Sequence, residues 1–299
     1  MSEPERIAKR LSRAGIASRR EAERMIEAGR VGVNGKIIDS PALNVGPTDK
    51  ITVDGAPLPE ADRPRLWLYH KPSGLVTSAK DEKGRDTVFD KLPDDLPRVM
   101  SVGRLDLTSE GLLLLTNDGA LKRKLELPAT GWLRKYRVRV KGKPTDADLA
   151  PLRRGIVIDG ERFQAMEATL DRQQGANAWL TVGLREGKNR EIRRAMAEIG
   201  LEVNRLIRVS YGPFRLGELK PGAVEEIKPR VLRDQLGLEA AVEGHAVAKE
   251  KPKRPLRKKP APARSNSANR PQASKAGDGV TGRPPKTPRP PRPAPRRPR

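Results

Sequence analysis

The stretch Gly103–Gly119, GRLDLTSEGLLLLTNDG, joins a polar loop to the short apolar run Leu112–Leu115. A continuous apolar run of this length, bounded by turn-forming residues, is typical of a strand that is buried on both faces. Asn117-Asp118-Gly119 then predicts a turn that leads into a basic helix. The stretch therefore predicts a loop that holds Asp106 at the start of a buried strand.

A carboxylate held in such a loop is a candidate reactive group. The alternative is a loop aspartate whose oxygens accept backbone N–H bonds, as aspartates commonly do in turns. From the pattern alone, the second interpretation of Asp106 is the commoner one, so the loop does not by itself establish catalysis.

Strand patterns recur between residues 63 and 238, and helical patterns occur only occasionally. The expected strands are Leu66–Tyr69, Leu112–Thr116, Tyr136–Val140, Ile156–Ile158, Ala165–Leu170, Trp179–Leu184 and Leu206–Val209. The expected helices are Ala120–Leu127, Asp146–Arg153, Arg190–Ile199 and Pro229–Leu236. Short links and the lack of strict β-α-β alternation predict an α+β domain with a mainly antiparallel mixed sheet.

Residues 1–62 form a separate pattern. Helices are expected at Arg6–Ala14 and at Ser18–Ala28, where Ser18 and Glu21 make a capping-box signature. Short strands are expected at Val31–Val33, Lys36–Ile38 and Lys50–Val53, around Asn-Gly and Asp-Gly turns. Two helices and a few short strands predict a small α/β module appended to the larger domain.

Basic charge dominates the composition, with 61 Lys and Arg against 38 Asp and Glu in 299 residues. The segment Lys249–Arg299 holds 17 of these cations and 13 prolines but no aromatic residue. Such a segment buries too little apolar surface to order itself, so we expect residues 239–299 to be a disordered basic tail. A polyanion is the partner that best explains the charge of both body and tail.

Other residue types exclude whole classes of function. The chain has no cysteine and only His70 and His245, so thiol chemistry and a histidine-based metal site are not expected. No glycine-rich nucleotide-binding pattern occurs, so no cofactor is expected. The charged N-terminus is no signal peptide, and no apolar run could span a bilayer. We expect a cytoplasmic monomer with no membrane contact.

The stretch Gly103–Gly119 also closely resembles the catalytic motif of a family of pseudouridine synthases. This is the family that contains small-subunit synthase A and the large-subunit synthases B, E and F. Its Arg-Leu-Asp stands here as Arg104-Leu105-Asp106, and its Thr-x-Gly as Ser109-Glu110-Gly111, where serine keeps the hydroxyl. The resemblance implies that Asp106 is the catalytic carboxylate.

Three further segments resemble the same family. The segment His70–Gly74, HKPSG, looks like its Lys-Pro-x-Gly motif, and Lys135–Val138 resembles the strand whose Tyr packs against the target base. Glu186–Arg194, EGKNREIRR, resembles the motif that supplies a basic partner to the catalytic Asp. The resemblance implies these roles for Tyr136 and Lys188. Alone, the three segments would indicate a turn, an aromatic residue on a sheet and a solvated charge run.

The continuation Asn204–Gly212 also matches the family, so the resemblance spans about residues 65–238. The module at 1–62 looks like the RNA-binding domain named for ribosomal protein S4, and large-subunit synthase B combines such a module with a basic tail. We therefore expect ribosomal RNA as the partner, held by cations that position it rather than read its bases. The candidate RNA contacts are Arg10, Arg13, Arg19, Arg20, Arg30, Lys71, Arg104, Arg190, Arg193 and Arg194.

The resemblance implies isomerisation of one uridine to pseudouridine, with large-subunit (23S) rRNA as the expected substrate. The reaction moves the anomeric carbon of the sugar from a base nitrogen to a base carbon. It needs no redox partner and at minimum one carboxylate beside that carbon. A cation within about 4–6 Å, here Lys188, would keep Asp106 ionised. We expect the target base to be flipped out of its helix into the pocket, against Tyr136.

Three alternatives stay open on the sequence. The chain could act on small-subunit rRNA or another structured RNA, because no residue pattern reads out the target. It could be a non-catalytic ribosome-assembly protein that uses the same basic surface. An RNA methyltransferase is disfavoured because neither a glycine-rich cofactor loop nor a catalytic cysteine occurs.

Overall fold

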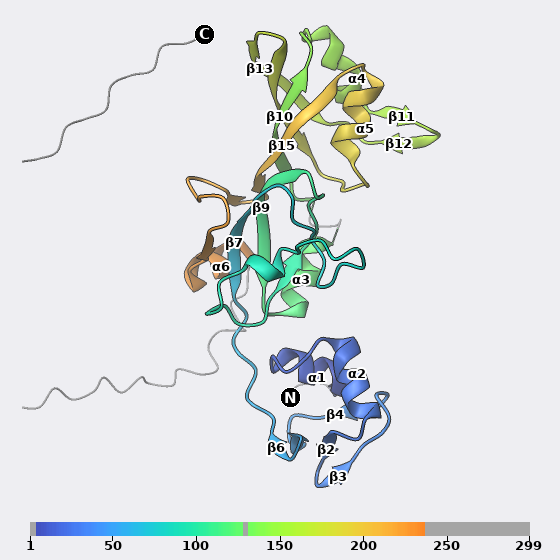
Figure 1. Ribbon diagram of the computed structural model, residues 1–299, viewed down its shortest axis with the longest axis vertical. Coiled ribbons are helices and arrows are strands. Elements are labelled where there is room, and N and C mark those ends of the chain that lie inside the picture. Colours follow the sequence, from blue (N-terminus) through green and yellow to red (C-terminus); the bar gives the residue numbers. More distant parts are fainter. Residues whose placement is uncertain (1–3, 128–130, 237–299) are drawn as a thin grey trace, which may run out of the picture. The chain divides into compact units, whose positions relative to one another are not determined.

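The computed structural model of the chain describes residues 4–127 and 131–236 (Figure 1). The tail predicted at residues 239–299 lies outside the described residues. The described residues form an N-terminal module and a larger sheet domain.

The N-terminal module has two helices, α1 (Ile7–Arg13) and α2 (Arg19–Glu27). The predicted capping box at the start of α2 is confirmed, since the Glu21 backbone N–H donates to the Ser18 hydroxyl over 3.2 Å. A four-stranded sheet has the order β3-β2-β5-β6, formed by Lys36–Ile37, Val31–Val33, Ile51–Val53 and Ala56–Pro57. A second pair joins β1 (Glu5–Arg6) to β4 (Asn44–Val45).

A nine-stranded mixed sheet forms the second region. Its main order is β13-β14-β10-β15-β9-β7-β17, with β16 added beside β15 and β8 beside β9. The strands are β7 (Leu66–Lys71), β8 (Met100–Val102), β9 (Ser109–Thr116), β10 (Arg134–Lys141), β13 (Glu167–Gln174), β14 (Asn177–Leu184), β15 (Glu202–Tyr211), β16 (Phe214–Arg215) and β17 (Val224–Glu226). Between β15 and β9 the pairing is parallel, and the other pairs described in this sheet are antiparallel. The predicted mainly antiparallel mixed sheet is confirmed.

Helices pack against the two halves of this sheet. Figure 1 shows α4 (Ala150–Arg154) and α5 (Glu191–Glu198) beside β10 and β15, with the hairpin of β11 (Ile156–Ile158) and β12 (Glu161–Phe163) next to them. The helices α3 (Gly119–Glu126) and α6 (Pro229–Leu236) lie near β9 and β7. Two apolar clusters result, one including Val138, Leu180 and Met196 and one including Leu112, Leu121 and Leu232. The two clusters lie on opposite faces of the sheet at β9, because Leu113 and Leu115 belong to the first and Leu112 and Leu114 to the second.

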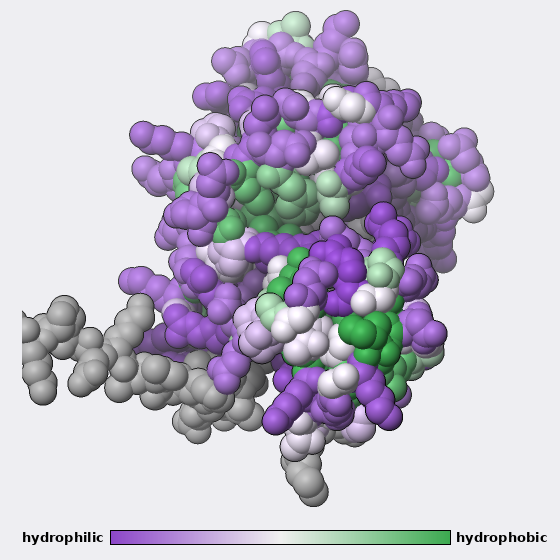
Figure 2. All heavy atoms as spheres, turned by 60° about the horizontal axis from the view of Figure 1, so that its bottom comes forward, coloured by the Kyte–Doolittle hydropathy of each residue, from purple (hydrophilic) through white to green (hydrophobic). Residues whose placement is uncertain are grey.

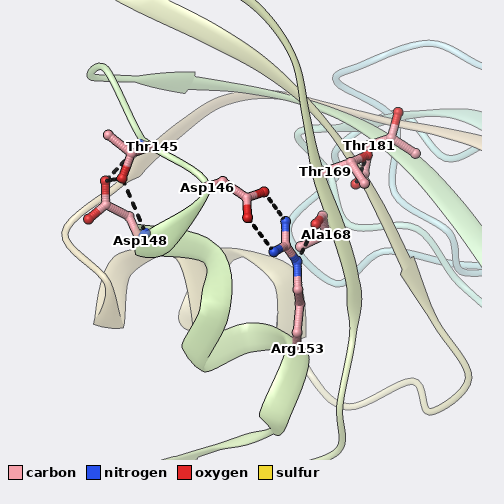
Figure 3. A network of polar contacts seen from close by, with 7 residues as sticks. All are labelled: Thr145, Asp146, Asp148, Arg153, Ala168, Thr169 and Thr181. Atoms are coloured by element: carbon pink, nitrogen blue, oxygen red, sulfur yellow. Dashed lines mark hydrogen bonds and ion pairs between the residues drawn. The ribbon is translucent and has the colours of Figure 1, made fainter.

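The helix predicted at Asp146–Arg153 forms one residue later, over residues 147–154, and its first turn is tighter than expected. It begins as a 3-10 turn, Ala147–Leu149, and continues as α4. Asp148 accepts the backbone N–H of Thr145 over 2.7 Å, which favours a tight first turn. Figure 3 shows Arg153 joining this segment to the sheet, because its guanidinium binds Asp146 and donates to the carbonyl of Ala168 in β13 over 2.8 Å.

Strand β9 confirms the predicted buried run, because Leu112–Leu115 have no exposed surface. The strand starts three residues earlier than predicted, at Ser109, since it pairs there with β15. Gly111 lies in this extension with φ +100°, and a Cβ placed on it would stand 2.3 Å from the carbonyl oxygen of Arg208. Only glycine lets the two strands approach so closely.

Gly111→Ala is therefore expected to lower the free energy of unfolding by about 3 kcal/mol, from backbone strain and the clash with β15. Gly84→Ala is the matched control, since Gly84 also has a positive φ (+67°) but nothing within 4 Å of its Cβ position. It should cost about 1 kcal/mol. Urea denaturation of both variants measures the difference, and equal losses would contradict the close approach.

Candidate active site

Residues from four neighbouring strands line up across the sheet domain. Tyr136 on β10 pairs with Arg208 on β15, Arg208 pairs with Gly111 on β9, and Gly111 pairs with Lys71 on β7. Residues paired in register project from the same face of a sheet. This cross-sheet row, Tyr136, Arg208, Gly111 and Lys71, thus brings four of the segments that resemble the family next to one another. Asp106 lies in the loop just before β9.

A pocket of about 450 Å³ opens beside the cross-sheet row, which is a usual size for a small-ligand site. Its lining includes all three predicted catalytic residues, Asp106, Tyr136 and Lys188. The remaining lining residues are Gly103, Arg104, Leu105, Ser109, Glu126, Arg134, Leu184, Arg185, Glu186, Gly187, Arg190, Glu191, Ile192, Leu206, Arg208 and Tyr211. The fold therefore gathers the motif residues into one cavity.

The Asp106 loop is held from beneath by Lys71. The Lys71 ammonium donates to the carbonyls of Asp106 (3.2 Å), Leu107 (3.4 Å), Ser109 (2.9 Å) and its neighbour Pro72 (3.0 Å). Burial lowers the pKa of Lys71 to about 8, although the charges of Asp106 and Glu110 act in the opposite direction. The side chain has no exposed surface. Lys71, which the sequence predicts as an RNA contact, is instead enclosed in this structure by the loop that it orders.

The ammonium of Lys188 is directed to other groups than the carboxylate of Asp106. Its ammonium lies 3.6 Å from Glu161 and 3.7 Å from Glu186, and it also donates to the carbonyl of Arg162. In the part of the chain that the structure describes, no ion pair joins Lys188 to Asp106. The pairing implied by the resemblance is thus not formed in this structure.

Arg193 is the motif cation whose ionisation responds to Asp106. Burial and the charge of Arg190 lower the pKa of Arg193, and the charge of Asp106 opposes them. Its guanidinium donates to the carbonyl of Thr108 (3.2 Å) in the Asp106 loop and to that of Val203 (3.0 Å) in β15. Arg193 therefore connects α5 to the Asp106 loop, a contact that the sequence did not predict.

The other predicted RNA contacts differ in their surroundings. Arg104 and Arg190 are exposed and line the pocket, whereas Arg194 forms an ion pair with Glu161 over 2.6 Å. In the N-terminal module, Arg19 and Arg20 are exposed. Three others are ion-paired, Arg10 and Arg13 with Glu5 and Arg30 with Asp54. Hydrophilic side chains cover most of the face seen in Figure 2, which suits a hydrated, charged partner.

Glu191 is a pocket residue that the sequence analysis missed. Its side chain is buried, with 4% of its surface exposed, and one oxygen accepts the backbone N–H of Lys188 over 2.9 Å. Burial, assisted by the nearby Glu186 carboxyl, raises the pKa of Glu191 to about 8. Glu191 therefore holds a proton at neutral pH. The signal was available, because position 191 falls in phase with the apolar face of α5.

Arg208 was also missed as a site residue, although it lay in a segment that matched the family. Its neighbour two positions earlier, Leu206, is apolar, and strand side chains alternate between faces. That alternation places Arg208 on the buried side, and the structure leaves it 3% exposed. Within residues 4–127 and 131–236, no cluster of three or more His, Asp or Glu could hold a metal ion. None of the helices in those residues is long and apolar enough to cross a bilayer.

The raised pKa of Glu191 predicts a pH-dependent effect of Glu191→Gln. The folded chain holds the proton up to about pH 8 and the unfolded chain only to about 4.5, so wild-type stability falls as pH rises between these values. Glutamine does not titrate. The variant should match the wild type at pH 5 and exceed it by on the order of 2 kcal/mol at pH 9.

Denaturant unfolding at pH 5, 7 and 9 measures this difference. Titration of Lys71 is common to both proteins and cancels. Glu198→Gln, at an exposed position of the same helix, serves as the control and should show no such trend. A constant difference between Glu191→Gln and the wild type across this range would mean that Glu191 is ionised throughout.

Comparison with known proteins adds independent evidence. Residues 65–198 match the family model described as RNA pseudouridylate synthase, and residues 5–51 match the S4 domain. An RNA pseudouridine synthase of Rickettsia felis is 49% identical over 228 residues, which cover 76% of this chain and 99% of that protein.

Two further comparisons concern ribosomal RNA and the fold. Ribosomal large subunit pseudouridine synthase B of Haemophilus influenzae is 39% identical over 264 residues, covering 85% of this chain and 74% of the relative. A crystal structure of a pseudouridylate synthase superposes with a TM-score of 0.54 and 24% identity, over 77% of this chain and 98% of that one. The last likeness concerns the fold alone.

Proposed function

The chain belongs to the RNA pseudouridylate synthase family and is an RNA-modifying isomerase, and on that premise we propose that it converts one uridine of large-subunit (23S) rRNA to pseudouridine, with Asp106 as the catalytic carboxylate. The observation that carries the proposal is the placement of Asp106 and Tyr136 in one pocket of about 450 Å³. A flipped uracil with its ribose fits a cavity of that size.

Asp106 suits the reaction for a physical reason. Cleavage of the bond from the anomeric carbon to the base nitrogen leaves an electron-poor sugar carbon, which a carboxylate stabilises or captures. The position of such a carboxylate must be fixed to well within an ångström to act efficiently. Three carbonyl contacts of Lys71, including that of Asp106 itself, hold the loop. The hydroxyl of Thr77 donates to the Leu105 carbonyl over 2.8 Å and adds a further anchor.

Tyr136 suits the support of a flipped base. It is 8% exposed, so its ring is largely buried and one part of it borders the pocket. A uracil that leaves its helix loses stacking, and an aromatic ring in the pocket replaces part of that stacking. The exposed cations Arg104 and Arg190 are placed at the same pocket, where they can contact the phosphates of the flipped nucleotide.

Large-subunit rRNA is favoured over other RNA by the relatives and by the N-terminal module. The relatives from Haemophilus influenzae and Escherichia coli O157:H7 are named as large-subunit synthases, at 39% and 42% identity. An S4 domain preceding the catalytic domain supplies RNA affinity. We propose boundaries at residues 1–62 and 63–238 for these two domains, and action in the cytoplasm, where rRNA is modified.

Asp106→Asn should abolish pseudouridine formation while leaving RNA binding within about threefold, because asparagine keeps the shape and removes the charge. In cells that lack the gene, chemical mapping of pseudouridine over all rRNA should reveal one missing site in 23S rRNA. The wild-type gene should restore this site and the Asp106→Asn gene should not.

The same map separates the remaining alternatives. A missing site in small-subunit rRNA would overturn the substrate proposal, and an unchanged map in all RNA would favour a non-catalytic assembly protein. Pseudouridine formation by the Asp106→Asn variant would show that Asp106 is not the catalytic carboxylate.

Arg193 and Lys188 can be distinguished as partners of Asp106. Because Arg193 contacts the catalytic loop and senses Asp106, Arg193→Met should slow single-turnover modification about 100-fold. Lys188→Met should slow it less than tenfold, since the ammonium of Lys188 is directed to Glu161 and Glu186. The reverse order would restore the partner role that the sequence motif implies for Lys188.

A further inference from the structure

One nitrogen of a buried guanidinium in the pocket lacks a hydrogen-bond acceptor. Five buried side-chain polar atoms in the described residues lack a hydrogen-bond partner, and two of the residues that carry them line the pocket, Glu191 and Arg208. The atom of Arg208 is Nη2, a donor, in a side chain that is 3% exposed. A buried donor without an acceptor costs free energy, so its persistence in a substrate pocket indicates an acceptor that arrives with the substrate.

The rest of the Arg208 side chain is fixed. Its Nε donates to the carbonyl of Leu112 over 2.7 Å, and its guanidinium lies 5.3 Å from the ring centroid of Tyr211. The same ring carries the guanidinium of Arg134 at 4.7 Å, and Arg134 also donates to the Tyr211 hydroxyl over 3.0 Å. The open donor of Arg208 is therefore held in a fixed position before any ligand binds.

The position of Arg208 indicates which part of the RNA it meets. Arg208 pairs in register with Tyr136, so the two side chains lie next to each other on the pocket side of the sheet. Phosphates stay with the RNA backbone at the exposed side of a pocket, where Arg104 and Arg190 are placed. The flipped base enters deepest, which leaves a uracil oxygen as the acceptor within reach of a buried residue.

Given the proposed function, we propose that Arg208 is a catalytic residue that stabilises the uracil as it leaves the sugar. When the bond from C1′ to N1 breaks, its electron pair stays on the base as a uracil anion, with the charge shared by N1 and the carbonyl oxygens O2 and O4. Arg208 donates to one of these oxygens. The anion then turns, C5 bonds to C1′, C5 loses its proton and N1 gains one, so the product is an isomer of the substrate.

The charges around the cross-sheet row favour this role. Arg208 lies close enough to the buried Lys71 to act on its ionisation, and Asp106 acts on Lys71 as well. Glu110, the other nearby carboxylate, is already held by Arg205 over 2.8 Å. A site with two buried cations and one unpaired donor stabilises the uracil anion more than it stabilises neutral uracil. Such a difference lowers the barrier to breaking the bond from C1′ to N1.

The test compares leaving groups. A transcript of the 23S rRNA segment found by pseudouridine mapping is made with uridine or with 5-fluorouridine, whose fluorine makes the base a better leaving group. Arg208→Met should slow single-turnover loss of the target uridine about 100-fold, with RNA affinity unchanged within about threefold. With 5-fluorouridine the same substitution should slow the reaction only about tenfold, because a more acidic base needs less stabilisation from the guanidinium.

Arg208→Lys keeps the positive charge but changes its geometry. It should lower the single-turnover rate about tenfold on the uridine transcript and less on the 5-fluorouridine transcript. Arg215→Met, at an exposed position of the neighbouring strand β16, should slow the reaction little on either RNA. Thermal unfolding of each variant checks the fold, and if Arg208→Met does not fold, the Arg208→Lys comparison decides.

Equal losses on the two RNAs would overturn the proposal and leave Arg208 a structural role. A loss confined to RNA affinity would overturn it in favour of a phosphate contact. Failure of the proposed function itself is distinguishable, because the wild-type protein would then leave the uridine transcript unmodified.

Discussion

The buried ammonium of Lys71 is the constraint on which the geometry of the pocket depends. A loop that presents a reactive carboxylate has carbonyl groups that no sheet partner satisfies, and these carbonyls must find donors or expose themselves to water. Here one side chain from β7 supplies the donors for the carbonyls of Asp106, Leu107 and Ser109. The cost of burying a charge is offset because each N–H of the ammonium meets an acceptor. The loop is thereby tied to the middle of the sheet, not to its surface.

That arrangement divides the cations of the pocket by depth. Lys71 and Arg208 lie beneath the site and act on groups already inside it, whereas Arg104 and Arg190 are exposed and face solvent. Exposed cations give affinity that weakens with salt, because bulk ions screen them. Buried cations act at low dielectric on the charge that changes during the reaction. On the proposed function, the exposed arginines therefore serve RNA binding and the buried Arg208 serves the chemistry.

The sequence predicted the fold well where a pattern had a single physical solution. Four consecutive leucines allowed only a doubly buried strand, and the capping box of Ser18 and Glu21 fixed the start of α2. The motif resemblance also predicted that Asp106, Tyr136 and Lys188 would share one pocket, which they do. The resemblance did not predict how deeply each side chain of the site is buried. The sequence predicts Lys71 as an RNA contact, and the structure, with β7 in register with β9, encloses it instead.

Partners across long sequence separations were likewise beyond the pattern. The carbonyl acceptor of Arg193 comes from Thr108, and the pairing of β15 with β9 joins Arg208 to Gly111, about a hundred residues apart. This parallel contact has a consequence for biosynthesis. The leucine-rich strand leaves the ribosome long before the strand that covers its other edge, so the nascent chain carries an apolar, unpaired edge for the time needed to make the intervening residues. Activity can arise only after that delay, when the last central strand has been made, and premature termination before it yields an inert, aggregation-prone fragment.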